Sequence, residues 1–303
     1  MLRIFDPRWG RHDKLFFLSL LPSFAILVAI VGLTFATFLG KAWPILSREG
    51  VSFFVSSRWW PDDDPSKCFY GILPALIGTL LTSGLAVGIS FPLTLAMVVA
   101  CNEILPRSVG NALSTLVLVA SSLPTVIYGL WGIEVVVPMV KELARYLGIE
   151  TTGFSILAAS IVLATMMIPY MFAIVNELYR SIPATYREAV YSIGARTWQA
   201  SRILLSMTRL GLVAAVLLAL GRATSETIVT TMLIGNVPSL TLNIFSPGVT
   251  IASLIATQFG ESYLYPYMEN ALYASALVLF LMGFSLSGIG MYLVIKWRRW
   301  VHG

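Results

Sequence analysis

Residues 210–235 of the chain read LGLVAAVLLALGRATSETIVTTMLIG, an apolar stretch that carries Arg222 and Glu226 near its middle. The stretch exceeds the roughly 20 residues that a helix needs to cross a bilayer. A charged side chain at the centre of such a helix costs about 2.5–3.5 kcal/mol on insertion scales, and ionisable residues at that depth generally mark a functional path. We therefore interpret this stretch as a membrane span that carries a site.

The four-residue spacing of Arg222 and Glu226 places both side chains on one face of a predicted continuous helix. In that geometry the two charges partly neutralise each other, while the guanidinium still offers its planar fork of donors to an anion. Two interpretations follow. The first is a structural ion pair that locks helices together, and the second is a site on the path of a solute.

The composition is that of an integral membrane protein. Of the 303 residues, 57% are hydrophobic and 12% are charged, which leaves no room for a large soluble domain beside several spans. The net charge is +5, but the basic residues lie between the apolar runs, where they act as a topology signal. Membrane lipid is therefore an expected partner, and nucleic acid is not.

Apolar runs of spanning length predict an all-α membrane protein with one transmembrane domain over residues 15–303, after a charged tail at 1–14. The six predicted transmembrane helices lie at about 15–40, 71–102, 108–140, 151–176, 210–235 and 271–295. The run 108–140 is too long for one upright helix, and Pro124 predicts a kink within it. Residues 250–259 are apolar but too short to cross, which indicates a re-entrant or interfacial segment.

An even number of crossings places both termini on one side of the membrane. The loop at 177–209, which is rich in arginine, falls on that same side. The connection at 236–270 has no Lys or Arg and falls on the other side. The positive-inside rule therefore predicts that both termini are cytoplasmic.

Several classes of function are disfavoured. Cys68 and Cys101 flank the second predicted span, so their Cα atoms should lie beyond the roughly 7 Å that a disulfide permits. His12 and His302 lie in the tails, and no spacing typical of metal ligands or of a nucleophile with its base is present, so we expect no metal site and no enzyme. No G-x-x-x-x-G-K-[ST] sequence occurs, so ATP has no P-loop on this chain.

The loop at 177–209 contains PATYREAVYSIGARTWQASRILLSMTR, residues 183–209. Residues 183–192 predict a short surface helix that ends before Gly194. Taken alone, this helix is either an interfacial turn without a partner or a segment that docks in a groove of another protein. Through Glu188, Ala189 and Gly194 the loop resembles the EAA loop of ABC-transporter permeases of the type I importer (MetI-like) fold. Ser206 and Met207 replace the Leu-Pro pair with which that motif normally continues.

Further motifs resemble the C-type permease subunit of the phosphate-specific transport (Pst) system, from about residue 70 to the C-terminus. They are YGILP (70–74), GTLLTS (78–83), PTVIYGLWG (124–132), GRATSET (221–227) and IGN (234–236). The first 70 residues match only in general layout.

The resemblance implies a permease in a bacterial or archaeal plasma (inner) membrane that forms half of a translocation path. Its implied partners are a homologous A-type permease, two ATPase subunits that hold ATP-Mg, and an external phosphate-binding protein. This chain itself is expected to hold no cofactor. The implied coupling residues are Glu188, Ala189 and Gly194, with Arg187 beside them. The implied path residues are Arg222, Thr224, Ser225 and Glu226.

The chemistry of these residues suits an oxyanion, because a guanidinium fits phosphate oxygens and stays charged. Our hypothesis for Glu226 is that it offsets Arg222 in the empty state and accepts a proton from a protonated phosphate, which sulfate lacks at neutral pH. The alternatives are an ABC permease for another oxyanion such as phosphonate or sulfate, an ion-coupled secondary transporter, and a membrane scaffold that transports nothing.

Overall fold

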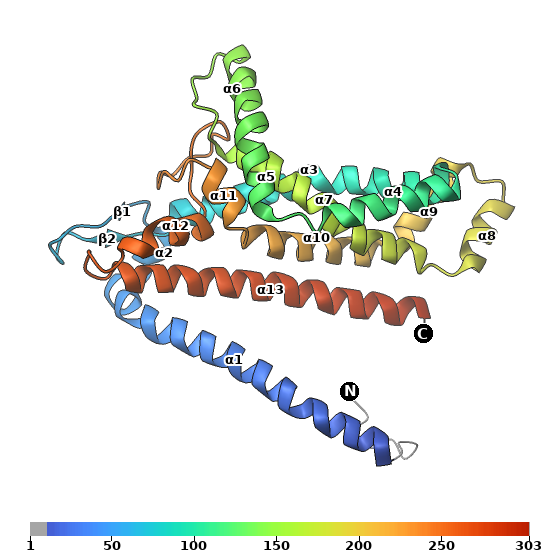
Figure 1. Ribbon diagram of the computed structural model, residues 1–303, viewed down its shortest axis with the longest axis horizontal. Coiled ribbons are helices and arrows are strands. Elements are labelled where there is room, and N and C mark those ends of the chain that lie inside the picture. The colour runs from blue at the N-terminus through green and yellow to red at the C-terminus, as the bar shows by residue number, and fades with distance from the viewer. Residues whose placement is uncertain (1–10, 303) are drawn as a thin grey trace.

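The computed structural model describes residues 11–302, so most of the predicted tail at 1–14 lies outside the described residues. The described part is mostly helical (Figure 1), as predicted. Four helices are long and apolar enough to cross a membrane, and two bent pairs raise the number to six if each pair forms one span. The predicted all-α membrane fold is therefore confirmed, with bends at two of the crossings.

The long helices are α1 (Arg11–Glu49), α3 (Leu73–Val99), α7 (Ile156–Arg180) and α13 (Met268–His302), and α3 continues into the π-helical turn η1 (Ala100–Ile104). The first bent pair joins α4 (Arg107–Ala120) at 93° to a run of α5 (Thr125–Trp131), the π-helical turn η2 (Gly132–Val136) and α6 (Val137–Tyr146). The second joins α9 (Thr197–Met207) at 71° to α10 (Arg209–Thr224). The short elements are α2 (Ser52–Val55), α8 (Ala184–Ser192), α11 (Ile228–Leu233), α12 (Ile251–Gln258), the 3₁₀ turn η3 (Phe259–Glu261) and the antiparallel strands β1 (Trp59–Trp60) and β2 (Phe69–Tyr70).

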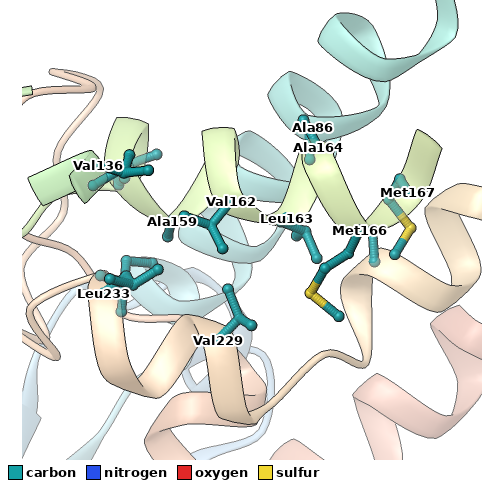
Figure 2. Close-up of a cluster of buried hydrophobic side chains, with 14 of the residues drawn as sticks. Ala86, Val136, Ala159, Val162, Leu163, Ala164, Met166, Met167, Val229 and Leu233 are labelled. Atoms are coloured by element: carbon teal, nitrogen blue, oxygen red, sulfur yellow. The ribbon is translucent and has the colours of Figure 1, made fainter. Parts of the chain in front are cut away.

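Helix α7 is the centre of the molecule. Of its most apolar window 67% is buried, against 33% in α3, 6% in α13 and none in α1. Figure 2 shows Val162 and Leu163 of α7 in a cluster with Ala86 of α3 and with Val229 and Leu233 of α11. Small residues on the facing helices let the backbones approach closely, which is how helices pack in lipid. The core therefore holds α11 directly against the centre of the bundle.

The third crossing breaks at the predicted kink. Helix α4 ends at Ala120, and Pro124 stands immediately before α5, where its missing N–H costs no helical hydrogen bond. The hydroxyls of Ser121 and Ser122 donate to the carbonyl oxygens of Leu118 and Val119 at 2.6 and 2.7 Å. The same two carbonyls also accept the backbone N–H groups of Ser121 and Ser122, so the last turn of α4 closes on itself before the break.

Helix α1 extends beyond the predicted boundary at Gly40. Its last turns are not a loop, because Ala42 and Ile45 are fully buried in a cluster with residues of α13. Lys41 also forms an ion pair with Glu269 of α13 at 3.0 Å. Packing against α13 thus keeps the chain helical to Glu49, although the sequence there becomes polar.

The ends of the bundle agree with an even number of crossings. In Figure 1, the start of α1, the end of α13, and α8 and α9 lie at one end, while β1, β2 and α12 lie at the other. The segment predicted not to cross is the short α12, capped by the Thr250 hydroxyl, which accepts a hydrogen bond from the Ser253 N–H at 3.0 Å. Cys68 and Cys101, one before α3 and one after it, are both free and buried.

Candidate functional site

The stretch with the intramembrane charges is not one helix. Helix α10 ends at Thr224, and α11 begins at Ile228. At the junction the Thr224 and Ser225 hydroxyls donate to the carbonyl oxygens of Gly221 and Arg222, at 3.0 and 2.9 Å. Hydroxyl groups that bond the preceding turn compete with continuation of the helix. The prediction that Arg222 and Glu226 share a face of one continuous helix is therefore wrong.

Arg222 lies in the last turn of α10 and its side chain is exposed. Its guanidinium carbon stands 5.3 Å from the centre of the Tyr170 ring of α7, a cation–π contact. Among the side chains that the structure describes, no carboxylate, that of Glu226 included, lies within 4.0 Å of the Arg222 guanidinium nitrogens. The Tyr170 ring therefore holds the guanidinium beside α7 at the end of α10.

The other predicted path residues meet at the same junction but differ in exposure. Ser225 is exposed and Glu226 is half-buried, whereas Thr224 is 3% exposed and turns into the protein. The Glu226 carbonyl accepts a hydrogen bond from the Thr230 hydroxyl at 2.6 Å, which fixes the start of α11. The structure thus brings Arg222, Ser225 and Glu226 together at a break in a helix, with Thr224 behind them.

Two of the sequence motifs build the frame around this junction. The Thr79 hydroxyl of α3 accepts a hydrogen bond from the Ile251 N–H, at the start of α12, at 2.9 Å. At the adjacent Gly78, an added Cβ would collide with the carbonyl oxygen of Val249. Beyond α11, the Asn236 side-chain amide donates to the Thr231 carbonyl at 2.7 Å. Thr79 and Gly78 thus hold the start of α12 against α3, and Asn236 closes the end of α11.

The EAA-like loop forms a second candidate site at the opposite end of α10. Helix α8 has no buried residue, and Glu188 and Ala189 are exposed on it. Gly194 has a φ of +79°, the left-handed conformation in which glycine commonly follows the end of a helix. We call α8 the coupling helix below. Its exposed residues are arranged as a surface that a partner can contact.

Arg187, by contrast, points back into this chain. Its Nη1 donates to Oε1 of Glu103 in η1 at 2.8 Å, and its guanidinium lies 5.2 Å from the centre of the Tyr179 ring. The hydroxyls of Tyr179 and Tyr191 also donate to Glu103, at 2.8 and 2.6 Å. Sequence reasoning missed Glu103. The available signal was a lone acid at the end of a span, opposite a loop rich in arginine.

The bond from Tyr191 persists across the physiological pH range. Burial, reinforced by the hydrogen bond to Glu103, raises the pKa of Tyr191 to about 12. The phenol therefore remains protonated and acts as a donor to the carboxylate.

Comparisons with known proteins place this geometry in context. Residues 92–299 match the family described as "Binding-protein-dependent transport system inner membrane component". Three curated relatives are phosphate transport system permease proteins named PstC, the first of them marked probable. The chain is 32% identical to that of Methanocaldococcus jannaschii over 293 residues, or 93% of each chain. It is 30% identical to that of Mesorhizobium japonicum over 287 residues, or 89% of this chain and 86% of that one. It is 33% identical to that of Haemophilus influenzae over 257 residues, or 79% and 80%.

A solved structure shares the fold. The chain resembles one from an inward-facing structure of the MetNI methionine ABC transporter with a TM-score of 0.52 and 20% identity, over 74% of this chain and 94% of that one. The predicted MetI-like permease fold is confirmed by this likeness, which extends to the fold alone.

Proposed function

Because the chain belongs to the family of inner membrane components of binding-protein-dependent transport systems, we propose that it is the permease subunit of an ATP-driven importer of inorganic phosphate. The family is a component of ABC transporters and not an enzyme, and ATP hydrolysis resides on separate subunits. Family membership also removes the secondary-transporter and scaffold alternatives. The phosphate assignment draws on the names of relatives about 30% identical to most of this chain.

The observation that supports an oxyanion substrate is the environment of the Arg222 guanidinium. This guanidinium lies at a break in a membrane helix beside the Tyr170 ring, and no carboxylate among the described side chains pairs with it, so its bidentate donors can bind a ligand. Ser225 adds a hydroxyl at the same break, and half-buried Glu226 stands one residue further on. We keep the hypothesis that Glu226 accepts a proton from phosphate, a role in which it needs no direct contact with Arg222.

The assembly follows from the family. An ABC permease of this kind works with ATPase subunits and a substrate-binding protein, and this chain is a multi-pass inner membrane protein. We further propose a homologous A-type permease as the other half of the path, two ATPase copies that hold ATP-Mg, and no cofactor on this chain. The arginine-rich connection around α8 supports a cytoplasmic location for that end and for both termini.

Uptake of labelled phosphate tests the substrate and the site together. Cells that lack this chain would receive the wild type, Arg222→Ala, Arg222→Lys or Glu226→Gln, with Arg145→Ala as control, since Arg145 is an exposed residue paired only with Glu142. We expect uptake with the wild type and the control, no reduction by excess sulfate, and little uptake with either Arg222 variant, because lysine keeps the charge but loses the fork.

Each other result has a defined meaning. Phosphate uptake at the wild-type rate in Arg222→Lys would exclude the bidentate role of Arg222. Unchanged rate and unchanged phosphate-over-sulfate preference in Glu226→Gln would remove the proton-accepting role. Sulfate or phosphonate uptake in place of phosphate uptake would assign a different oxyanion.

A further inference from the structure

We propose that Glu103 is a positioning residue that ties the coupling helix to the membrane helices, so that movement of α8 is transmitted to α3 and α7. The proposal rests on the ATP-driven transport described above. It concerns a group outside the candidate substrate path, and it assigns Arg187 a partner within this chain.

The contacts of Glu103 form a closed set. Its side chain is 5% exposed at the end of a membrane helix, where it forms an ion pair with Arg187. Three donors surround it: Tyr179 from α7, and Arg187 and Tyr191 from α8. A buried carboxylate needs such partners, because an unpaired charge in the protein interior is strongly unfavourable. One acid thus bonds two segments that lie more than 70 residues further along the chain.

The local backbone presents Glu103 toward these partners. Helix α3 widens into the π-helical turn η1, closed by a hydrogen bond from the Leu105 N–H to the Ala100 carbonyl at 2.9 Å. A π-helical turn adds a residue to the helix and re-aims the side chains within it, and such turns are frequent at functional sites. Pro106 stands immediately before α4, so the π-helical turn lies directly at the connection between α3 and α4.

A second network makes the same end of the bundle rigid. The Asn102 side-chain amide donates to Oδ1 of Asn176 at 2.8 Å, and Nε of Arg180 donates to Oδ1 of Asn102 at 3.0 Å. Arg180 also donates to Asn111 of α4 at 3.2 Å. These bonds join η1, α4 and α7 into one body. The coupling helix lacks buried residues of its own. Within the described chain its side chains contact this body through the bonds of Arg187 and Tyr191 to Glu103, and through the cation–π contact of Arg187 with Tyr179.

The arrangement predicts what the tether does. A force applied by an ATPase to the exposed face of α8 reaches α3 through the Arg187 and Tyr191 bonds and reaches α7 through the Tyr179 bond. If the carboxylate is lost, α8 still presents Glu188 and Ala189 to its partner, but less of its displacement reaches the membrane helices, because only the Arg187–Tyr179 contact and the backbone at 181–183 still join them. Binding of the ATPase should therefore survive while coupling weakens.

The test uses the assembled transporter, purified from its membrane with its ATPase, carrying wild-type chain, Glu103→Gln or Glu177→Gln. Glu177 lies at the same end of α7 and is exposed, which makes it a matched control. Amide hydrogen exchange in α8 should become at least about tenfold faster in Glu103→Gln, the factor expected when a hydrogen bond to a charged group is lost. It should not change in the control. Unchanged protection of α8 in Glu103→Gln would overturn the tether.

A separate experiment tests the coupling. It measures the amount of labelled phosphate that reconstituted vesicles take up for each ATP hydrolysed. We expect this ratio to fall several-fold in Glu103→Gln while the ATPase still co-purifies and hydrolyses ATP. A ratio equal to that of the wild type would overturn the claim. If the wild type itself moved no phosphate, the proposed function would fail, whereas the exchange result would still decide the tether. If Glu103→Gln does not assemble, Tyr191→Phe replaces it, because this variant removes one hydrogen bond to Glu103 and keeps the ring. We then expect a smaller increase in the exchange rate of α8 and a smaller fall in the phosphate-to-ATP ratio, and no change in either would overturn the proposal.

Discussion

At the scale of single residues, the guanidinium of Arg222 depends on the ring of Tyr170. The two side chains come from different helices, α10 and α7, so the contact fixes a long and otherwise mobile side chain at the junction after α10. A cation–π contact of this kind contributes about 0.5–1 kcal/mol when exposed and about 2 kcal/mol when desolvated. We therefore expect the ring to orient the guanidinium for an anion without contacting the anion itself.

We predict that Tyr170→Leu raises the phosphate concentration for half-maximal uptake several-fold, because the guanidinium loses its aromatic support. Tyr170→Phe keeps the ring face and should behave like the wild type. The concentration dependence of labelled phosphate uptake measures both. Equal behaviour of the leucine and phenylalanine variants would contradict a role for the ring.

At the scale of helices, the sequence predicts the crossings well and their interruptions unevenly. Long apolar runs located α3, α7 and α13, and Pro124 marked the break before α5 because proline lacks a backbone donor. No proline or glycine marks the junction at 225–227. There the break comes from hydroxyls at Thr224 and Ser225 that bond carbonyls of the preceding turn, a choice that local sequence alone leaves open.

Tertiary contacts explain the other elements that the sequence did not predict. The extension of α1 to Glu49 depends on burial against α13, which a local pattern does not encode. Glu103 likewise has meaning only through Arg187 and Tyr191, which lie far along the chain. The residues of the candidate path were identifiable because a charge within an apolar run is conspicuous, whereas the tether of the coupling helix was not.

The packing of helix α3 on the segment before α12 can be tested with one methyl group. We predict that Gly78→Ala destabilises the protein by about 1–3 kcal/mol, the usual cost of overpacking, because the new Cβ meets the rigid carbonyl of Val249. Gly84→Ala on the same helix is the control, since an added Cβ there meets nothing within 4 Å. Thermal unfolding of the purified protein in detergent measures the difference. Similar melting temperatures for the two variants would show that the segment yields to the methyl group.

At the scale of the whole molecule, the fold places its two kinds of surface feature at opposite ends. One end carries the coupling helix and its tether to Glu103, and the other carries the β1–β2 hairpin and α12 (Figure 1). Helix α10, which meets α9 at a 71° bend, runs between them and carries Arg222 in its last turn. This layout connects a surface that partners can contact to a site within the membrane through continuous helices.

The orientation of this layout is open to a labelling experiment in intact cells. We predict that a membrane-impermeant maleimide modifies Lys67→Cys, in the hairpin, and reaches Ser192→Cys only after the membrane is permeabilised. Lys67 and Ser192 are both exposed, and the native cysteines are buried, so the background should be low. The opposite pattern would place the coupling helix outside and invert the proposed topology.

Helix α1 imposes a geometric demand on the surrounding lipid. Its candidate membrane span, Leu18–Glu49, has 32 residues and includes the charged last turns, which at about 1.5 Å per residue makes a rod about 48 Å long. The hydrocarbon layer of a bilayer is only about 30 Å thick. The rod therefore fits by tilting and by lifting its last turns into the headgroup region, where the charges of Lys41 and Arg48 are hydrated. Because those same turns are fastened to α13, the angle at which the bundle stands in the membrane is tied to the thickness of the bilayer.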